Sequence, residues 1–204
     1  MAGRWSTAVA LVVVSLLVFP HFPSPSLADD VEDTIGEAQK LYKSGDYNET
    51  IRELEFAIQL VRRKKSERLK AVFPGALPGW EEKEVDITGA SSAYLGGGIQ
   101  ASREYTKGGA KVVIDVFMDN PFLQGIFAVV DNPLLFSPES EPVRVGGNRA
   151  NLFYDPATRE GELKLVFRKK VLISVRGYRI GSADLLKEYA GGINFGYLQE
   201  IMER

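Results

Sequence analysis

The sequence predicts an α+β protein in which an N-terminal antiparallel helical hairpin precedes a mainly antiparallel sheet covered by helices on one face. Three observations support this fold class. Apolar residues recur with the helical period over residues 29–70, and they alternate with polar residues, as in a strand, from residue 82 onward. A stretch rich in Pro and Gly separates the two regions. The later strand-like segments are short and joined by turns, which favours antiparallel pairing.

The expected organisation of the chain has four parts. They are an export signal over residues 1–28, the helical hairpin over residues 29–72, a linker over residues 73–80 and an α+β domain over residues 81–204. Of the 204 residues, the 176 that follow the signal are enough for one domain of ordinary size with an appendage. Because the chain contains no cysteine, its stability must come from packing and not from disulfide bonds.

The export signal is predicted from its three-part layout. Arg4 lies in a short start, residues 8–19 are an apolar run, and Ser26-Leu27-Ala28 places small residues at positions suited to cleavage after Ala28. A helix that spans a bilayer needs roughly 20 apolar residues, and this run is shorter. We therefore expect an exported, periplasmic protein that is cleaved after Ala28 and has no transmembrane segment in its mature chain.

The mature chain is expected to lack both histidine and cysteine, because the only histidine, His21, lies within the export signal. Without these residues the mature chain has no Ser-His-Asp triad, no cysteine nucleophile and no zinc site of the usual type. Its 24 basic and 27 acidic residues give a mild net charge of −3, which does not predict nucleic-acid binding. We therefore expect no cofactor and no metal site, and we favour a binding function over catalysis.

Two apolar stripes joined by a short turn predict the hairpin. The first stripe consists of Ile35, Ala38, Leu41 and Tyr42. The second consists of Ile51, Leu54, Ile58 and Val61, and it is widened by Ala57 and Leu60. We expect Gly45 to end the first helix in the left-handed conformation. We expect Asn48 to cap the second helix, with Glu49 in its first turn.

The hairpin also carries residues at the spacing of a known repeat, namely Ala38, Leu41, Gly45, Tyr47, Leu54 and Ala57. Over residues 31–62 the chain therefore resembles a single tetratricopeptide repeat. Thr50 and Arg62 depart from that repeat, which has a small Ala and often a Pro at these two places. Since no second copy of the repeat follows, a peptide-binding groove is not expected. The hairpin is expected to pack on the next domain or to pair with another chain.

A boundary and several strand-like runs predict the second region. The boundary is the Pro- and Gly-rich segment 74–79, after which Trp80 is expected to anchor the junction. Lys107-Gly108-Gly109 predicts a hairpin between two alternating runs, residues 99–106 and 112–119. The clearest apolar face consists of Val112, Ile114, Val116 and Met118. Further strands are expected at residues 82–88, 143–145, 150–154, 163–167 and 171–175.

Two short helices are expected to close the chain. Ser182 is expected to cap the first, with Asp184 in its first turn, and Gly191-Gly192 is expected to end it. The apolar face of this helix consists of Leu185, Leu186 and Tyr189. Asn194 is expected to cap the second helix, whose apolar residues are Phe195, Leu198, Ile201 and Met202.

Three short motifs carry a resemblance to a known group of proteins. They are Leu77-Pro78-Gly79-Trp80, Gly97-Gly98 with Ser102, Arg103 and Tyr105, and Leu185-Leu186-Tyr189-Ala190 with Ile193. Through them residues 80–204 resemble an uncharacterised family of exported bacterial proteins. That resemblance implies export and the extent of the domain, and it implies no activity. In outline, a curved antiparallel sheet with covering helices is also similar to the PsbP-like and Mog1-like folds.

Two surfaces are candidates for binding a partner. One is the basic run near the end of the second helix, Arg62, Arg63, Lys64 and Lys65, which suits an acidic partner or an anionic lipid surface. The alternative is a solvated helix face whose cations complement the helix dipole. The other candidate is the apolar segment 121–136, which either packs on the sheet or is exposed, and its binding residues would be Phe122, Leu123, Ile126 and Phe127.

The leading hypothesis is a non-enzymatic exported protein that binds a partner protein or an envelope component, through the hairpin and the segment 121–136. One alternative is a carrier of apolar ligands with a pocket under that segment. Another is a glycan hydrolase that uses two carboxylates, either Asp115 with Asp119 or Glu160 with Glu162. Acidic residues that alternate along a strand are also typical of a solvent-exposed face, and we expect that simpler arrangement here.

Overall fold

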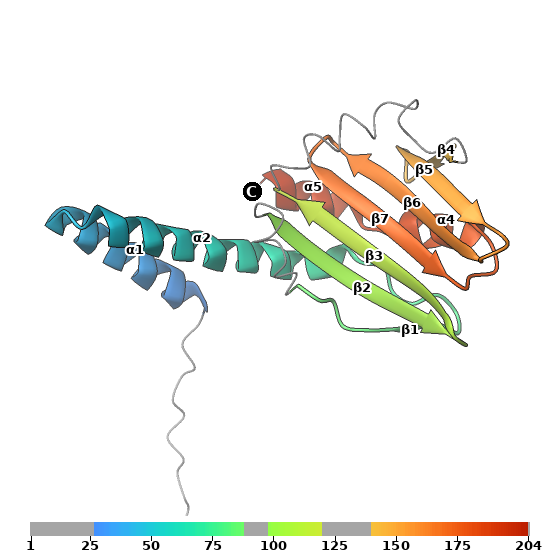
Figure 1. Cartoon of the computed structure of the whole chain (residues 1–204), viewed down its shortest axis with the longest axis horizontal. Helices are drawn as coiled ribbons and strands as arrows, with labels where there is room; N and C mark the ends of the chain where they lie inside the picture. The colour runs from blue at the N-terminus through green and yellow to red at the C-terminus, as the bar shows by residue number, and fades with distance from the viewer. Residues whose placement is uncertain (1–26, 88–97, 120–139, 204) are drawn as a thin grey trace, which may run out of the picture.

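A helical hairpin followed by an antiparallel sheet makes up the fold, so the predicted α+β class is confirmed (Figure 1). The computed structural model describes residues 27–87, 98–119 and 140–203. Within these ranges the chain has four α-helices, one 3-10 turn and one seven-stranded sheet. The hairpin projects from one end of the sheet domain. The apolar segment 121–136 lies outside the described residues.

Helices α1 and α2 form the hairpin. Helix α1 spans Leu27–Ser44, and α2 spans Tyr47–Leu69. A 3-10 turn, η1, continues α2 over Lys70–Val72. Gly45 has a φ of 83°, which confirms the left-handed turn predicted after the first helix. The longer helix, α2, reaches the sheet domain at its C-terminal end, whereas the turn between the helices lies far from the sheet (Figure 1).

Two predicted helix caps are wrong. Asp46, and not Asn48, caps α2, because its carboxylate accepts a hydrogen bond of 3.2 Å from the backbone N–H of Glu49. The helix starts one residue before Asn48, which therefore lies inside the first turn. Ser182 does not cap helix α4 either. Ala183 occupies the position directly before that helix and provides no side-chain hydrogen bond. Acidic residues still lie in the first turn of both helices, where they complement the dipole.

The strands follow the order β1-β2-β3-β7-β6-β5-β4, and every neighbouring pair is antiparallel. The C-terminal strand β7 therefore lies between β3 and β6, and it joins the first strand hairpin to the later strands. The bounds of the strands are β1 Glu81–Glu82, β2 Ile99–Lys107, β3 Ala110–Met118, β4 Glu141–Val145, β5 Asn148–Asp155, β6 Glu160–Phe167 and β7 Val171–Tyr178.

The first strand is shorter than predicted, whereas the hairpin that follows is confirmed. Strand β1 has only two residues, and Asp86 then forms an isolated bridge with Ser102. Glu82 pairs with Tyr105, so the chain advances four residues from Glu82 to Asp86 while β2 advances three from Ser102 to Tyr105. The extra residue interrupts the ladder, as in a β-bulge. Strands β2 and β3 are joined by two glycines, Gly108 and Gly109, which have φ values of 52° and 85°.

The core lies between the sheet and helices α4 and α5, which cover one face of it (Figure 1). Helix α4 spans Asp184–Gly191 and α5 spans Phe195–Glu203. Asn194 caps α5 as predicted, since its side-chain oxygen accepts a hydrogen bond of 3.0 Å from the backbone N–H of Tyr197. The predicted apolar face of β3 is at most 1% exposed, and it consists of Val112, Ile114, Val116 and Met118.

No helix in the described part of the chain combines the length and the apolar character that a membrane crossing requires.

Candidate functional site

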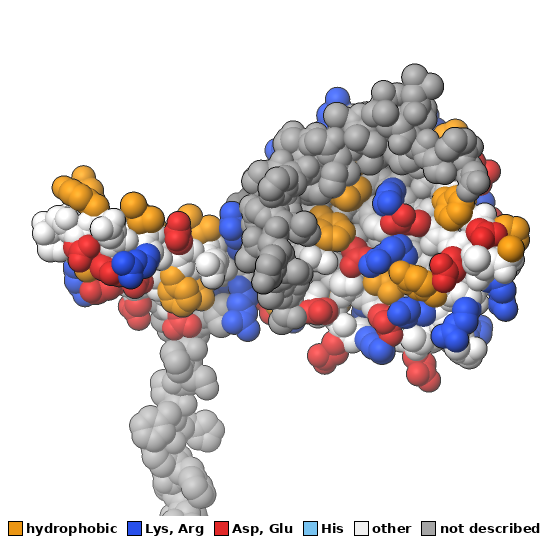
Figure 2. Space-filling view, viewed as in Figure 1, with side chains coloured by type: hydrophobic (Ala, Val, Ile, Leu, Met, Phe, Trp, Pro, Cys, Tyr) orange, Lys and Arg blue, Asp and Glu red, His pale blue; other side chains and the backbone are white. Residues whose placement is uncertain are grey.

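Large exposed apolar side chains in the described part of the chain all belong to the helical hairpin. Figure 2 shows hydrophobic side chains along the upper edge of the projecting hairpin. The exposed fractions of these residues range from 45% for Leu54 to 62% for Tyr42 and Tyr47. We use the name apolar face for seven of them, namely Ile35, Tyr42, Tyr47, Ile51, Leu54, Ile58 and Val61.

The residues that α2 contributes to the apolar face form one straight stripe. They are separated by steps of four, three, four and three residues, in the order Tyr47, Ile51, Leu54, Ile58 and Val61. With 3.6 residues per turn, such steps keep all five side chains on one side of the helix. The same spacing forms the contact seam between helices in coiled coils. Five large apolar residues therefore lie on one side of α2, where each is 45–62% exposed.

The residues of α1 extend this stripe across the hairpin. Ile35 and Tyr42 are seven residues apart, which is close to two helical turns, so they lie on one side of α1. The ring of Tyr42 contacts the ring of Tyr47, with 5.9 Å between the centroids. The eighth exposed residue, Phe56, follows Leu54 by two positions and therefore lies on the opposite side of α2. The apolar face is thus a single surface formed by both helices.

Small side chains fill the contact between α1 and α2. Ala38 is 2% exposed and Ala57 is 4% exposed. Thr50 is also buried, and its hydroxyl donates a hydrogen bond of 2.7 Å to the backbone carbonyl of Asp46. Small residues let two helices approach closely, and the large apolar residues then remain outside their contact. The hairpin therefore cannot bury its apolar face by itself.

The base of the hairpin is fixed to the sheet domain on the same side as the apolar face. Lys65 and Leu69 continue the stripe of α2, each four residues after the preceding stripe position. Leu69 and Val72 are fully buried in the core of the domain. The ammonium group of Lys65 lies 2.7 Å from a carboxylate oxygen of Asp119, directly after β3. One side of α2 is therefore covered by the domain at its C-terminal end and uncovered over residues 47–61.

The predicted binding residues fall into three groups. Of the basic run, Lys65 is used inside the molecule, in its ion pair with Asp119. Arg62, Arg63 and Lys64 form no ion pair with the described residues, so they are available on the surface of α2, where Arg63 is the most exposed. The apolar candidates in the segment 121–136 lie outside the described residues, and they are Phe122, Leu123, Ile126 and Phe127.

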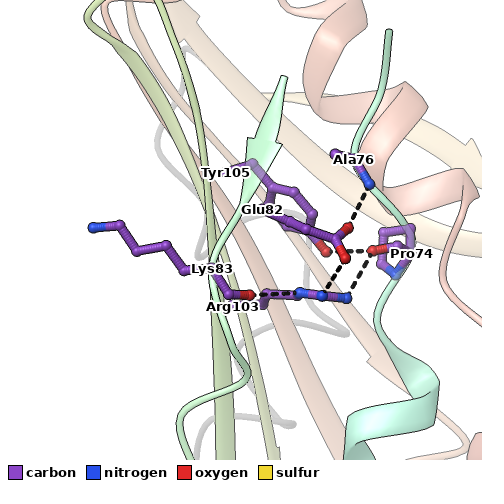
Figure 3. A network of polar contacts seen from close by, with 6 residues as sticks. All are labelled: Pro74, Ala76, Glu82, Lys83, Arg103 and Tyr105. Carbon is purple, nitrogen blue, oxygen red and sulfur yellow. Dashed lines mark hydrogen bonds and ion pairs between the residues drawn. The ribbon is translucent and has the colours of Figure 1, made fainter. Parts of the chain in front are cut away.

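A network of polar contacts holds the linker against β1 and β2 (Figure 3). The guanidinium group of Arg103 forms an ion pair with Glu82 and donates a hydrogen bond of 2.9 Å to the backbone carbonyl of Lys83. The hydroxyl of Tyr105 donates a hydrogen bond of 2.7 Å to the carbonyl of Pro74. The backbone N–H of Ala76 donates to the other carboxylate oxygen of Glu82, at 2.6 Å. The linker is therefore held by side chains of the sheet.

Aromatic rings continue this junction into the core. The ring of Tyr189 lies 4.5 Å from that of Tyr105 and 5.6 Å from that of Trp80, centroid to centroid. Trp80 thus packs on the core, as the sequence predicts for the junction. Burial raises the pKa of the Tyr105 hydroxyl well above its ordinary value, and burial also raises the pKa of Tyr189 to about 12. Both hydroxyls are therefore protonated, which suits a role in structure.

A row of polar side chains crosses the central strands on the sheet face opposite to α4 and α5. Arg176 donates a hydrogen bond of 2.7 Å to Asp115, and Ser174 donates one of 2.9 Å to Glu162. Glu162 also lies 2.6 Å from the ammonium group of Lys164. Burial lowers the pKa of Arg176, but the hydrogen bond and the charge of Asp115 outweigh this effect and raise that pKa overall. Each carboxylate in the row is therefore paired with a neighbour.

The expectation that Asp115 lies on a solvent-exposed face is wrong. Asp115 is 4% exposed, because the guanidinium group of Arg176 from the neighbouring strand covers it. Three carboxylates of the two predicted pairs contact other side chains. Asp115 contacts Arg176, and Asp119 contacts Lys65. Glu162 contacts Ser174 and Lys164. Glu160 is exposed at the start of β6. Among the described residues, no three carboxylate, His or Cys side chains gather in a way that could hold a metal ion.

Six of the seven residues of the apolar face belong to the two predicted stripes, and Tyr47 does not. None of the seven is among the predicted binding residues. A stripe of apolar residues on a helix usually marks its buried side. The position of the small residues distinguishes a buried stripe from an exposed one. Ala38 and Ala57 lie in the contact between α1 and α2, so the large residues beside them stay exposed.

Comparisons of the chain with models of protein families, with curated proteins and with solved structures found no match.

Proposed function

We propose that this is a non-enzymatic exported protein that binds a partner protein in the periplasm through the apolar face of its hairpin. The observation that supports the proposal is the exposure of Ile35, Tyr42, Tyr47, Ile51, Leu54, Ile58 and Val61 on one surface, at 45% to 62% each. None of the large apolar residues described in the sheet domain is among the exposed ones.

The size of the apolar face supports a binding role. The aromatic and aliphatic side chains involved have areas of up to about 200 Å² each, so seven half-exposed ones offer on the order of 700 Å². The largest apolar patch on an ordinary soluble monomer is about 300–600 Å², and larger patches typically mark binding sites. Covering this surface would be favourable by roughly 25 cal/mol for each Å² removed from water. A protein partner can cover the apolar face along the whole length of α2 from Tyr47 to Val61.

The proposed location follows from the N-terminal segment. The apolar run over residues 8–19 and the small residues before Ala28 are typical of a cleaved export signal. The proposed absence of catalysis follows from composition, because no histidine or cysteine occurs after residue 28. The proposed location can be checked by N-terminal sequencing of the protein recovered from the periplasm, which should begin at Asp29.

Site-specific photocrosslinking in living cells tests the binding surface. A photoreactive phenylalanine derivative is introduced at Ile51 or at Ile58 on the apolar face, and at Phe56 as the matched control on the opposite side of α2. We expect discrete crosslinked products from Ile51 and Ile58, identified by mass spectrometry, and none from Phe56. Equal products from all three positions, or products from Phe56 alone, would contradict the proposal.

A further inference from the structure

We propose that the partner of the apolar face is a second copy of this chain, whose hairpin packs antiparallel against the first to form a four-helix bundle. The inference rests on the proposed function, because it requires the apolar face to be a protein-binding surface. It goes further by committing to one occupant, one relative orientation and one set of facing residues.

The spacing of the stripe on α2 favours pairing with an equal helix. Steps of four, three, four and three residues from Tyr47 to Val61 are those of a coiled-coil seam, in which side chains of one helix fill the gaps of an equal helix. A surface of this kind is complementary to itself. Two-fold pairing uses the same surface on both chains, and it closes the assembly at two copies. A second copy therefore matches the apolar face without any further requirement.

The area of the apolar face is close to the area that a stable dimer buries on each chain. Seven side chains at 45% to 62% exposure offer on the order of 700 Å². A stable interface of standard size buries about 800 Å² on each partner, including its polar rim. The polar residues beside the stripe would supply that rim, among them Asn48, Glu55 and Arg62. One hairpin of a second copy is enough to cover the face and to reach this size.

The attachment of the hairpin to its domain decides the orientation. Lys65 and Leu69 lie on the same side of α2 as the apolar face, and there they contact the domain. If two copies met in parallel, both domains would lie at the same end, each in the space that the other hairpin needs. An antiparallel pair places the tip of each hairpin next to the domain of the other copy. The fold therefore permits the antiparallel pair and excludes the parallel one.

The register of the pair follows when the two-fold axis passes between Leu54 and Ile58, the middle of the stripe from Tyr47 to Lys65. Leu54 of one copy then faces Ile58 of the other. Ile51 then faces Val61, and Tyr47 faces the stem of Lys65. All of these positions lie on the stripe of α2. Residue 51 of one copy is about ten residues, or roughly 15 Å, from residue 51 of the other along the helix axes.

Sedimentation of the purified protein tests the pairing. We expect a dimer with a dissociation constant in the micromolar range or below. Leu54→Glu and Ile58→Glu should each weaken dimerisation by at least about 30-fold, because each places a charge in the centre of the seam. The control Phe56→Glu, at a residue 51% exposed on the opposite side, should leave the dimer unchanged. A wild-type monomer at about 100 μM, or equal weakening by Phe56→Glu, overturns the proposal.

Disulfide trapping tests the orientation in a way that does not depend on charge substitutions. The chain has no cysteine, so each introduced one is unique. A disulfide needs Cα atoms about 4.4–6.8 Å apart. We expect an Ile51→Cys variant mixed with a Val61→Cys variant to form a mixed disulfide, and neither variant alone to form its own. A disulfide between two copies of the Ile51→Cys variant, without the mixed product, would overturn the proposed pairing of residue 51 with residue 61.

The failures of the two proposals are distinguishable. A monomer in solution, together with crosslinks from Ile51 and Ile58 to a different envelope protein, overturns the second copy as partner and leaves the proposed function standing. A monomer whose apolar face yields no crosslink in cells overturns both. Crosslinks from these positions only to the same chain support the dimer and identify the partner as the second copy.

Discussion

The ammonium group of Lys65 lies 2.7 Å from a carboxylate oxygen of Asp119, although the two residues are 54 positions apart in the sequence. This ion pair ties α2 to the end of β3, beside the place where Leu69 enters the core. It marks the point at which one side of α2 passes from contact with the domain to exposure. The relative importance of the ion pair and of the buried residue can be measured.

Replacing Leu69 by Ala should destabilise the protein much more than replacing Lys65 by Ala. Leu69 is fully buried, and truncating such a side chain costs about 2–5 kcal/mol in the free energy of unfolding. The Lys65 side chain is 26% exposed and that of Asp119 is 46% exposed, so their ion pair contributes about 1 kcal/mol or less. Urea denaturation followed by circular dichroism measures both. Similar losses for the two variants would show that the ion pair dominates the attachment.

Replacing Tyr105 by Phe should destabilise the junction of the linker and the sheet. The substitution removes the hydrogen bond of 2.7 Å from the Tyr105 hydroxyl to the carbonyl of Pro74, which keeps a longer one of 3.4 Å from Arg103. Because the carbonyl keeps one donor, the expected cost is that of a single hydrogen bond, about 0.5–1.5 kcal/mol. Tyr42→Phe is the matched control, because Tyr42 is 62% exposed and its variant should be within about 0.5 kcal/mol of the wild type. Equal stability of the two variants, measured in urea, contradicts the assigned role.

Stability should fall at alkaline pH because of Tyr189. Its pKa is raised by burial to about 12 in the folded chain, whereas a tyrosine in an unfolded chain ionises near about 10. The folded state therefore holds the proton more tightly, and the stabilisation is present below pH 10 and is lost as the pH rises toward 12. Between these values the free energy of unfolding should decrease by up to about 1.4 kcal/mol per pH unit for this residue.

The variant Tyr189→Phe isolates this effect. Tyr105 also has a raised pKa, and the lysines ionise in the same pH range, so part of the alkaline loss is common to both proteins. We expect a smaller decrease in the variant than in the wild type when the free energies of unfolding at pH 9 and pH 11 are compared. Identical decreases in the two proteins would show that Tyr189 does not contribute to the alkaline loss of stability.

Replacing Asp115 by Asn should destabilise the sheet, because it removes the charge that pairs with Arg176 at 2.7 Å. The Arg176 side chain is 44% exposed and can be hydrated in part, so the expected cost is about 1–3 kcal/mol. Asp119→Asn provides the comparison, since that carboxylate is far more exposed and should cost about 1 kcal/mol or less. Thermal unfolding at neutral pH distinguishes the two, and a greater loss for Asp119→Asn would reverse the assignment.

Much of the fold could be predicted from local patterns. The two-residue turn at Gly108 and Gly109 and the left-handed turn at Gly45 follow from the conformations that only glycine adopts readily. The buried face of β3 follows from strict alternation, since side chains in a strand point to opposite sides. Helix caps were less predictable, because Asp46 and Asn48 are both good capping residues and only the start of α2 selects between them.

The candidate site was only partly predictable, because exposure depends on contacts between distant segments. The sequence identified the stripes of α1 and α2, but it could not show that Ala38 and Ala57 fill the contact between the helices. It likewise indicated a solvent-exposed position for Asp115, whose burial depends on Arg176 in a strand that lies next to β3 only in the folded sheet. Neither relationship is encoded by residues near one another in the chain.

The sequence alone determined the order of helices and strands, the faces of the strands and the absence of histidine and cysteine after residue 28. These properties depend on backbone conformations and periodicities that extend over a few residues. Tertiary structure decided that β7 lies between β3 and β6, that Asp115 is covered, and that α2 is buried at Leu69 and exposed at Leu54. The physical reason is that burial is a property of the surfaces that meet, and a helical stripe has the same period whether or not another surface covers it.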